Sequence, residues 1–467
     1  MRGQPLGKLD TQLQQALSER STGTFNVIIR ATEEQRGRLR GTMSRFVRKF
    51  RREFRRSNSV EANLTLAQLR SLSKQPWVKS ISLDAPMQMG GFTDETPAQT
   101  YSLRGSLGLS DLARTGAGVG VAVIDTGIDG TTDLAAPITA FYDFTLGDTP
   151  VATTPTDPHG HGTHIAGLIA GAGTEDPSTR GVAPGVRLIG LKVMGDNGGG
   201  SASAVLAALE FAVENKAALG IDVINLSLGH PIYESAATDP LVQAVEACVQ
   251  AGIVVVVSAG NSGMKLDGTG PGFAGILSPG NAPSAITVGA TRTQNTLTQF
   301  DDRLAPYSSR GPSWYDSFAK PDLSAPGHQL PSLAAKNGTL YTTYPTLHQG
   351  NDYIRLCGTS MAAGVVSGSV ALVLETYRAE HPDAPALTPN TVKAMLMYSA
   401  VALRQDDGTA YPPITAGVGS LNPEGAMALA GAFNPTPAPG EPYIVGVTPV
   451  TVTPSGESLA WGQNIVW

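Results

Sequence analysis

The stretch Val121-Ala-Val-Ile-Asp125-Thr-Gly127 joins a short apolar run to an aspartate and a glycine turn. Similar β-rich apolar runs recur along the chain and alternate with helical segments, for example at 202–219 and 241–251. Strands that alternate with helices form a mainly parallel sheet covered on both faces. We therefore predict an α/β fold with strands at 120–124, 188–193, 221–226, 253–258 and 285–288.

Asp125 follows directly on the first of these strands. In an open α/β sheet, ligand sites form at the carboxyl ends of the strands, so Asp125 is a candidate site residue. An aspartate before a glycine is also a common cap of an ordinary turn. Taken alone, the residue leaves both interpretations open.

The stretch Asp157-Pro-His-Gly-His161-Gly-Thr-His164 places histidines among glycines before a small-residue helix. Three histidines in one loop can suggest a metal site. The HExxH pattern and the ligand spacing of zinc sites are missing, which disfavours a metal, and we assign no metal ligands. We expect His164 to have a structural role at the start of the helix and His159 to be a loop residue.

The stretch Gly358-Thr-Ser360-Met361 precedes an apolar helix that we expect to reach about Tyr377. Helix N-termini favour negative charge because their amides and the helix dipole point there. A single serine at this position is more often an ordinary N-cap. The three stretches become specific only together, in the order Asp125, His161, Ser360, which is the triad order of subtilisin.

On these motifs the sequence resembles the subtilisin-like serine proteases. The similarity covers about residues 105–430. Further segments are similar to the family's, namely 180–184, 225–229, 258–261, 307–312 and 320–327. The resemblance implies a subtilisin-like fold and a serine endopeptidase that hydrolyses peptide bonds through an acyl-enzyme.

The resemblance also implies a role for each site residue. Ser360 would be the nucleophile, His161 its base and then the acid for the leaving amine, and Asp125 the group that orients the imidazole. Asn261 would donate to the oxyanion. Substrate would pair as a strand along a cleft, with a shallow pocket made by Leu277 for uncharged side chains. The expected substrate-binding residues are Leu226, Ser227, Leu228, Gly229, Ala259 and Gly260.

Two other functions are weighed against a peptidase. An esterase favours a GxSxG elbow and the order Ser, Asp, His, which this chain does not have. A binding protein on an inactive scaffold is disfavoured because all four catalytic groups are present. His161 and Asn261 also disfavour the acid-acting relatives that carry Glu in place of His.

The N-terminal part differs from the rest in charge. Residues 1–90 carry 17 Lys and Arg against 7 Asp and Glu, a net +10, whereas the remaining residues carry 16 against 32, a net -16. We predict strands at 25–30, 57–63 and 78–83 and amphipathic helices at 42–56 and 64–74, as in a ferredoxin-like split βαβ sandwich. This unit resembles the family's propeptide, so we expect an intramolecular inhibitor that docks on the acidic body. The alternative is a membrane or nucleic-acid arm.

We divide the chain into a leader (1–20), the propeptide-like domain (21–90), a linker (91–104), the catalytic domain (105–432) and a Pro/Thr-rich tail (433–467) that we expect to be an extended linker. Residues 85–89 would lie in the cleft, with self-cleavage near 87–96. The composition, 41% hydrophobic and 15% charged, excludes wholesale disorder.

We expect polypeptide substrates, no nucleic-acid partner and a monomer. No run of 18 apolar residues is present, which predicts no membrane-spanning helix. Catalysis needs no cofactor; structural calcium is common in the family, but no EF-hand pattern identifies ligands. Residues 1–7 lack the apolar core of a signal peptide, although the resemblance implies secretion. We expect Cys248 and Cys357 to be buried free thiols.

Overall fold

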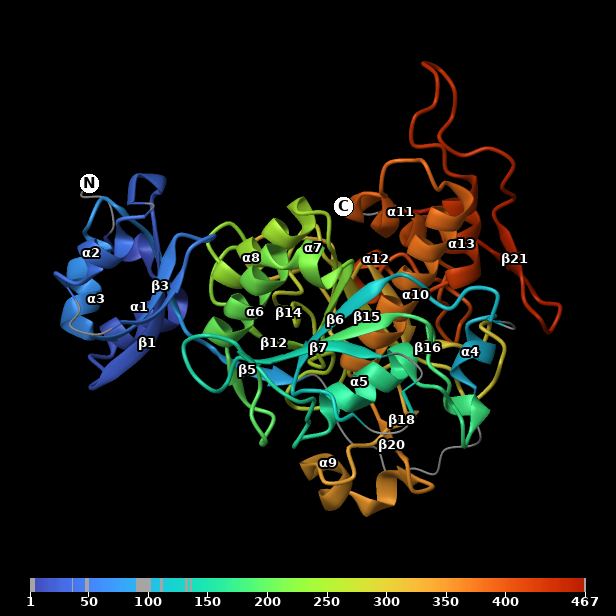
Figure 1. Cartoon of the computed structure of the whole chain (residues 1–467), viewed down its shortest axis with the longest axis horizontal. Helices are drawn as coiled ribbons and strands as arrows, with labels where there is room; N and C mark the ends of the chain where they lie inside the picture. Colours follow the sequence, from blue (N-terminus) through green and yellow to red (C-terminus); the bar gives the residue numbers. More distant parts are fainter. Residues whose placement is uncertain are drawn as a thin grey trace.

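A computed structural model describes residues 5–35, 37–46, 50–89, 102–109, 112–130, 133–134 and 137–465. The chain forms a small N-terminal unit and a larger body that follows it (Figure 1). The N-terminal unit has a core of its own, whereas the body has two large cores on opposite sides of its sheet.

The body is built on nine strands: β6 (Gly120–Asp125), β7 (Ile138–Asp143), β8 (Val151–Ala152), β9 (Arg187–Lys192), β11 (Val223–Leu226), β13 (Val254–Ser258), β15 (Ile286–Arg292), β16 (Arg303–Leu304) and β17 (Leu323–Pro326). Their order is β16-β15-β13-β11-β6-β9-β7-β8, with β17 also beside β15. Only β8 and β16 pair antiparallel. The predicted mainly parallel sheet is confirmed.

Alternating side chains of the central strands face two helical layers. Val121 and Val123 of β6 pack toward α5 (His161–Ala170), α10 (Thr359–Glu380) and α13 (Pro423–Ala432). Ala122 and Ile124 pack toward α6 (Ala202–Glu214) and α8 (Pro240–Gln250). Because both faces are covered, the central strands are mostly apolar, as the sequence pattern requires. The predicted helix 202–219 breaks after Glu214, and Lys216–Leu219 continues it as α7.

Helix α10 passes through the middle of the body (Figure 1). It is the one described helix that is long and apolar enough to cross a membrane by length and composition. Its apolar window is 94% buried inside the protein, which is typical of a core helix. The expected absence of a membrane span stays a prediction.

The N-terminal unit has a four-stranded sheet where three strands were predicted. Its elements are β1 (Thr24–Ala31), α2 (Leu39–Met43), β2 (Phe50–Phe54), β3 (Ser59–Thr65), α3 (Leu66–Ser73) and β4 (Val78–Leu83). The strand order is β2-β3-β1-β4, and every neighbouring pair is antiparallel. Strands alternate with helices in the order β-α-β-β-α-β.

The predicted helix 42–56 is wrong. Helix α2 ends at Met43, and Phe50 and Phe54 lie in β2 instead, paired with Ala62 and Ser59 of β3. A strand fits the same spacing here because the register of β2 shifts between Phe50 and Glu53, and the strand directs Phe50 to the core of the N-terminal unit and Phe54 to the body. Burial of Phe54 against the body decides between helix and strand, because Phe54 belongs to the core that contains α6 and α8.

The predicted leader belongs to the N-terminal unit. Residues 11–18 form helix α1 (Thr11–Ser18), after a short 3-10 turn at Pro5–Lys8. Leu9, Leu13 and Leu17 pack into the same core as Val27 and Ile29 of β1. A boundary at residue 21 therefore cuts through this core.

The segment after β4 crosses from the N-terminal unit into the body. It forms β5 (Pro86–Met89), which lies between β10 (Gly200–Ser201) and β12 (Leu228–Pro231). Strand β12 also pairs with β14 (Leu277–Ser278). Of the predicted linker, residues 91–101 lie outside the described residues, and Leu103–Ser106 form helix α4.

The remaining elements of the body are α9 (Thr339–Thr343), α11 (Pro389–Ser399), α12 (Pro413–Ala416), β18 (Leu330–Leu333), β19 (His348–Gln349), β20 (Tyr353–Leu356), β21 (Val450–Val452) and β22 (Ser458–Ala460). Strands β21 and β22 form an antiparallel hairpin. Cys248 and Cys357 are buried and form no disulfide bond with each other.

The prediction of an extended linker is wrong for this end of the tail. The indole of Trp461 is buried and donates a 2.9 Å hydrogen bond to Thr451, which also accepts one from Asn422 of the body. Trp461 further forms a backbone bridge with Val401. A sequence rich in Pro and Thr can still fold as an edge hairpin when one large aromatic side chain anchors it.

We predict that Trp461→Ala lowers the free energy of unfolding by about 3 kcal/mol, because it removes a buried aromatic side chain and leaves a cavity. Denaturant titration followed by circular dichroism measures this change. Val452→Ala, at a side chain that is 65% exposed in the same hairpin, is the matched control and should have little effect. Equal stability of the two variants would show that the hairpin does not contribute to the core.

Candidate active site

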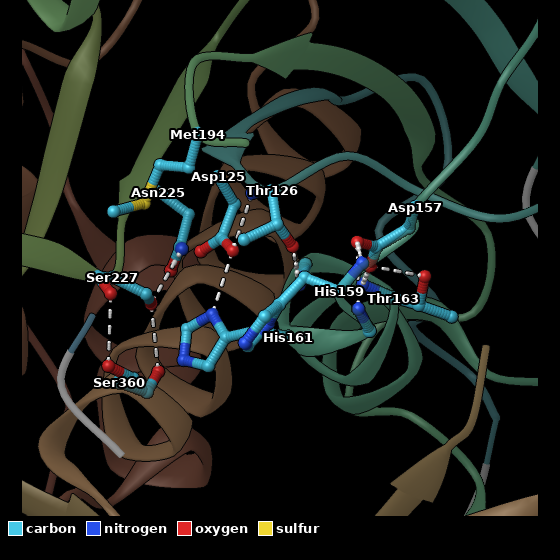
Figure 2. Close-up of polar contacts among 12 residues, drawn as sticks. Asp125, Thr126, Asp157, His159, His161, Thr163, Met194, Asn225, Ser227 and Ser360 are labelled. Atoms are coloured by element: carbon cyan, nitrogen blue, oxygen red, sulfur yellow. Dashed lines mark hydrogen bonds and ion pairs between the residues drawn. The ribbon is translucent and has the colours of Figure 1, made fainter. Parts of the chain in front are cut away.

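The candidate site lies at the carboxyl end of β6. Asp125 is fully buried there, and its Oδ1 lies 2.7 Å from Nδ1 of His161 (Figure 2). The backbone amide of Thr126 donates to the same oxygen at 2.8 Å. The structure thus brings together two of the predicted residues that are 36 positions apart.

His161 is positioned by a loop that one carboxylate organises. Asp157 accepts hydrogen bonds from the amides of His159, Gly160 and Thr163 and from the Thr163 hydroxyl, at 2.7–3.2 Å. Gly160, with φ of 103°, precedes the first residue of α5, which is His161. These bonds fix the start of α5 and therefore the direction in which the imidazole points.

A close approach of backbones completes this corner. A Cβ atom at Gly162 would lie 2.0 Å from the carbonyl oxygen of Gly127, so only glycine fits there. The Gly162 amide donates to the Thr126 hydroxyl at 2.9 Å. Lys192 of β9 donates from Nζ to the carbonyls of Thr126 and Met194, each at 2.7 Å. The turn after β6 is therefore held from two sides.

Ser360 begins the buried helix α10 together with Thr359. Its hydroxyl donates to the Ser227 carbonyl at 3.0 Å, and the Ser227 hydroxyl donates to the Ser360 carbonyl at 2.9 Å. Figure 2 shows the imidazole of His161 between Asp125 and Ser360, with one ring nitrogen toward Asp125 and the other on the side of Ser360. Nε2 of this ring is buried and has no hydrogen-bond partner. The serine hydroxyl is thus bonded to β11–β12 and not to the histidine in this state.

Asn261 lies beside the start of α10. Its Oδ1 accepts from the Thr359 amide at 3.0 Å and from the Thr359 hydroxyl at 3.2 Å. Since these bonds use the oxygen, they fix the amide plane and leave its NH2 group as a donor. The sequence prediction placed Asn261 next to Ser360, and the structure ties it to the residue before Ser360.

The predicted substrate-binding residues lie in two groups, one along β11 and β12 and one just after β13. Leu226, Ser227, Leu228 and Gly229 lie along β11 and β12, and β12 is already paired with β5, with Leu228 opposite Met89 and Gly229 opposite Gln88. Ala259 and Gly260 form the other group, where the Ala259 carbonyl accepts from the Leu277 amide at 3.1 Å.

The side chain of Leu277 lies between these two groups. A Cβ atom built at Gly260 would lie 2.7 Å from Cγ of Leu277. One built at Gly229 would lie 2.9 Å from Cβ of Leu277. Leu277 therefore lies against both glycines.

Burial and charge set the protonation of the three histidines. Burial disfavours the charged form of His161, but the attraction and hydrogen bond of Asp125 outweigh it and raise its pKa above 6.5. Burial lowers the pKa of His164 to about 3; its Nε2 lies 3.0 and 3.1 Å from the carbonyls of Leu330 and Ile354. Burial, and then the neighbouring His161, lower the pKa of His159.

The three histidines do not converge on one point. Within the described part of the chain, no group of three or more His, Cys, Asp or Glu side chains is arranged to hold a metal ion. His164 instead joins α5 to β18 and β20 through its ring.

Sequence reasoning missed several residues that support the site. They are Thr126, Asp157, Lys192 and Asn225, the last of which donates to the Ser227 hydroxyl at 2.9 Å. Asp157 and Thr126 stood inside the quoted motifs, four residues before His161 and one after Asp125. Asn225 and Lys192 sit within apolar strands, where a lone polar residue is a usable signal.

Comparison with known proteins agrees with the geometry. A family model described as the subtilase family matches residues 116–421. The serine protease AprX of Bacillus subtilis is 38% identical over 67% of this chain and 67% of its own length. Subtilisin DY of Bacillus licheniformis is 35% identical over 67% of this chain and 91% of its own length. The extracellular serine proteinase of Thermus sp. (strain Rt41A) is 32% identical, covering 72% and 67%.

A solved structure supports the same fold. Fervidolysin from Fervidobacterium pennivorans, a keratinolytic enzyme related to subtilisin, matches with a TM-score of 0.65 and 22% identity. The match covers 87% of this chain, which spans 61% of the length of that protein.

We predict that Asp125→Asn lowers the pKa of His161 below 6.5, because the substitution removes the negative charge while the burial remains. Titration of ¹⁵N-histidine-labelled protein by NMR measures both states. His164 is the internal control and should stay neutral above pH 4 in both proteins, given its pKa of about 3. An unchanged His161 titration would mean that Asp125 does not determine its charge.

Proposed function

Since this chain belongs to the subtilase family of serine endopeptidases, we propose that it hydrolyses peptide bonds with Asp125, His161 and Ser360, and that it is made in a form inhibited by its own N-terminal unit. The buried 2.7 Å contact between Asp125 and His161, with the ring directed at Ser360, carries the first part of the proposal.

In this mechanism His161 takes the proton of the Ser360 hydroxyl as the oxygen attacks the substrate carbonyl. The hydroxyl first exchanges its bond to the Ser227 carbonyl for one to Nε2, the ring nitrogen that has no partner. Asp125 holds the proton at Nδ1 and stabilises the imidazolium, in keeping with its effect on the pKa of His161. His161 then protonates the leaving amine, and water resolves the acyl-enzyme by the same steps in reverse.

The negative charge that develops on the carbonyl oxygen needs donors. We propose the NH2 group of Asn261 and the backbone amide of Ser360 at the start of α10. The bonds from Thr359 hold the amide of Asn261 in advance, so that little reorganisation is needed during the reaction. In subtilisin, a relative, loss of the corresponding donor lowers kcat by about 10²–10³.

Inhibition by the N-terminal unit is supported by β5. Residues 86–89 pair with β10 and β12 as an extended substrate strand would, and so they exclude other polypeptides. Polar contacts reinforce the docking: Asp84 accepts from the Ser203 amide at 2.7 Å, and Glu210 of α6 accepts from the Ser57 amide at 2.8 Å. Arg52 donates to the carbonyls of Phe144 and Gly147.

We propose that self-cleavage occurs shortly after Met89, within the predicted stretch 87–96, of which residues 90–96 lie outside the described residues. The order of strands and helices in the N-terminal unit supports the ferredoxin-like interpretation. Secretion, a monomeric state and structural calcium without identified ligands complete the proposal; the extracellular relative supports the first of these.

An inactive binding scaffold stays the second candidate, and a fluorophosphonate probe distinguishes the two. After removal of the N-terminal unit, labelling at Ser360 supports an enzyme. Absence of labelling supports a scaffold.

We predict that Ser360→Ala yields the full chain uncut, because the hydroxyl supplies the attacking oxygen. Mass spectrometry of the purified protein measures the ends of the products. Ser369→Ala, whose hydroxyl donates to the Val365 carbonyl within the same helix, is the control and should be processed like the unmodified chain. If Ser360→Ala were cut at the same bond, another protease would be responsible.

We predict that Leu277→Ala opens the pocket between Gly229 and Gly260. Relative to the unmodified enzyme, kcat/KM should rise about tenfold for peptides with Phe before the cleaved bond and change little for those with Ala, a difference expected from one large apolar group. Leu266→Ala, at a fully exposed side chain in the preceding loop, is the control. An unchanged Phe-to-Ala ratio would contradict the role of Leu277.

A further inference from the structure

A cavity of about 500 Å³ lies beside the cleft strand β5 and next to His161. His161 forms part of its lining, but the proposed chemistry gives the space itself no role, and the pocket at Leu277 is separate from it. Its lining combines the apolar side chains of Met87, Met89, Leu340, Tyr344 and Leu356 with the polar residues Gln88, His159, His161 and Asn197. A volume of this size and a lining of this kind are typical of sites that bind small apolar groups.

The outer wall of the cavity comes from the excursion 335–352, which contains α9. Hydrogen bonds tie this excursion to the loop before His161: the Leu340 amide donates to the His159 carbonyl at 2.9 Å, and the Thr339 amide to the Pro158 carbonyl at 2.9 Å. Leu340 and Tyr344 are therefore held at a fixed place relative to the catalytic imidazole.

Strand β5 indicates which kind of side chain reaches the cavity from the cleft. Met89 is paired with Leu228, and a Cβ atom built at Gly198 would lie 2.2 Å from Cε of Met89 and 2.9 Å from Nε2 of His159. Met89 thus lies over a glycine, against His159, at the mouth of the cavity. The chain's own strand already places a long apolar side chain here.

We propose that this cavity binds the side chain of the substrate residue that takes the place of Met89, and that Leu340 and Tyr344 make it select a long apolar side chain such as Met or Phe. The inference rests on the proposed function, because it assumes that substrates pair with β12 as β5 does. Polar side chains of the same length are disfavoured because the Leu340 and Leu356 side chains offer an amide no partner for the hydrogen bonds that it makes with water.

The test uses self-processed enzyme and internally quenched peptides that carry the sequence of residues 84–96 with Met, Phe, Gln or Ala at position 89. Gln matches Met in length and differs in polarity. The enzymes are the unmodified protein, Leu340→Ala, Tyr344→Ala and, as control, Thr343→Ala, whose side chain is exposed on α9 and does not line the cavity.

We expect kcat/KM to be about tenfold higher for Met and Phe than for Gln and Ala, as for burial of one apolar side chain. Leu340→Ala and Tyr344→Ala should reduce this preference severalfold and keep the circular dichroism spectrum. Thr343→Ala should retain the preference.

Three outcomes overturn the inference. Equal rates for all four peptides would mean that the cavity holds only solvent, and a preference that survives in both cavity variants would place its origin elsewhere. In both cases retained hydrolysis of the Ala peptide shows that the proposed function stands. Absence of hydrolysis of every peptide by processed enzyme overturns the proposed function itself, and the inference with it.

Discussion

The site depends on the close contact between the turn after β6 and the first turn of α5. At this point Gly162 lies against the carbonyl of Gly127, the Gly162 amide binds the Thr126 hydroxyl, and the Asp125 carboxylate meets the imidazole of His161 at 2.7 Å. A side chain at Gly162 would separate the two elements and break the buried hydrogen bond between Asp125 and His161. The parallel sheet places Asp125 at the end of β6, and the hydrogen bonds of Asp157 fix the start of α5. Gly127 and Gly162 allow these two segments to lie in contact.

Much of this arrangement could be predicted from the sequence because local pattern and tertiary structure agree there. Apolar runs at 120–124 and 253–258 became buried strands, and Asp125 and Asn261 lie at or just beyond their carboxyl ends. The helix predicted at 42–56 failed because Phe50 and Phe54 are equally compatible with a strand, and only pairing with β3 and burial on the body decide. The prediction of an extended linker for the Pro/Thr-rich tail failed for a similar reason. The position of Trp461 depends on contacts of the hairpin with Asn422 and Val401, which are distant in sequence.

The net charges predicted that the N-terminal unit docks on the body, but they did not predict which contacts hold it there. The opposite net charges predicted docking, yet the contacts that join the unit to the body are strand pairing, hydrogen bonds and the packing of Phe54 into the core that contains α6 and α8. The ion pairs between described residues, such as Arg51–Glu61 and Arg378–Asp222, join residues of the same unit. Net charge thus favours approach, while β5 and the face of α6 determine the docked geometry.

Strand β5 is covalently continuous with the N-terminal unit, so the fraction of molecules in which β5 occupies the cleft does not depend on protein concentration while the chain is intact. As long as the polypeptide is uninterrupted, the strand competes for the cleft at an effective local concentration in the millimolar range, whatever the amount of protein present. Once the link after Met89 is broken, the two pieces form an ordinary bimolecular complex, whose population follows mass action. At high protein concentration most of the cleaved enzyme would then remain inhibited, and dilution of the same sample would release its proteolytic activity.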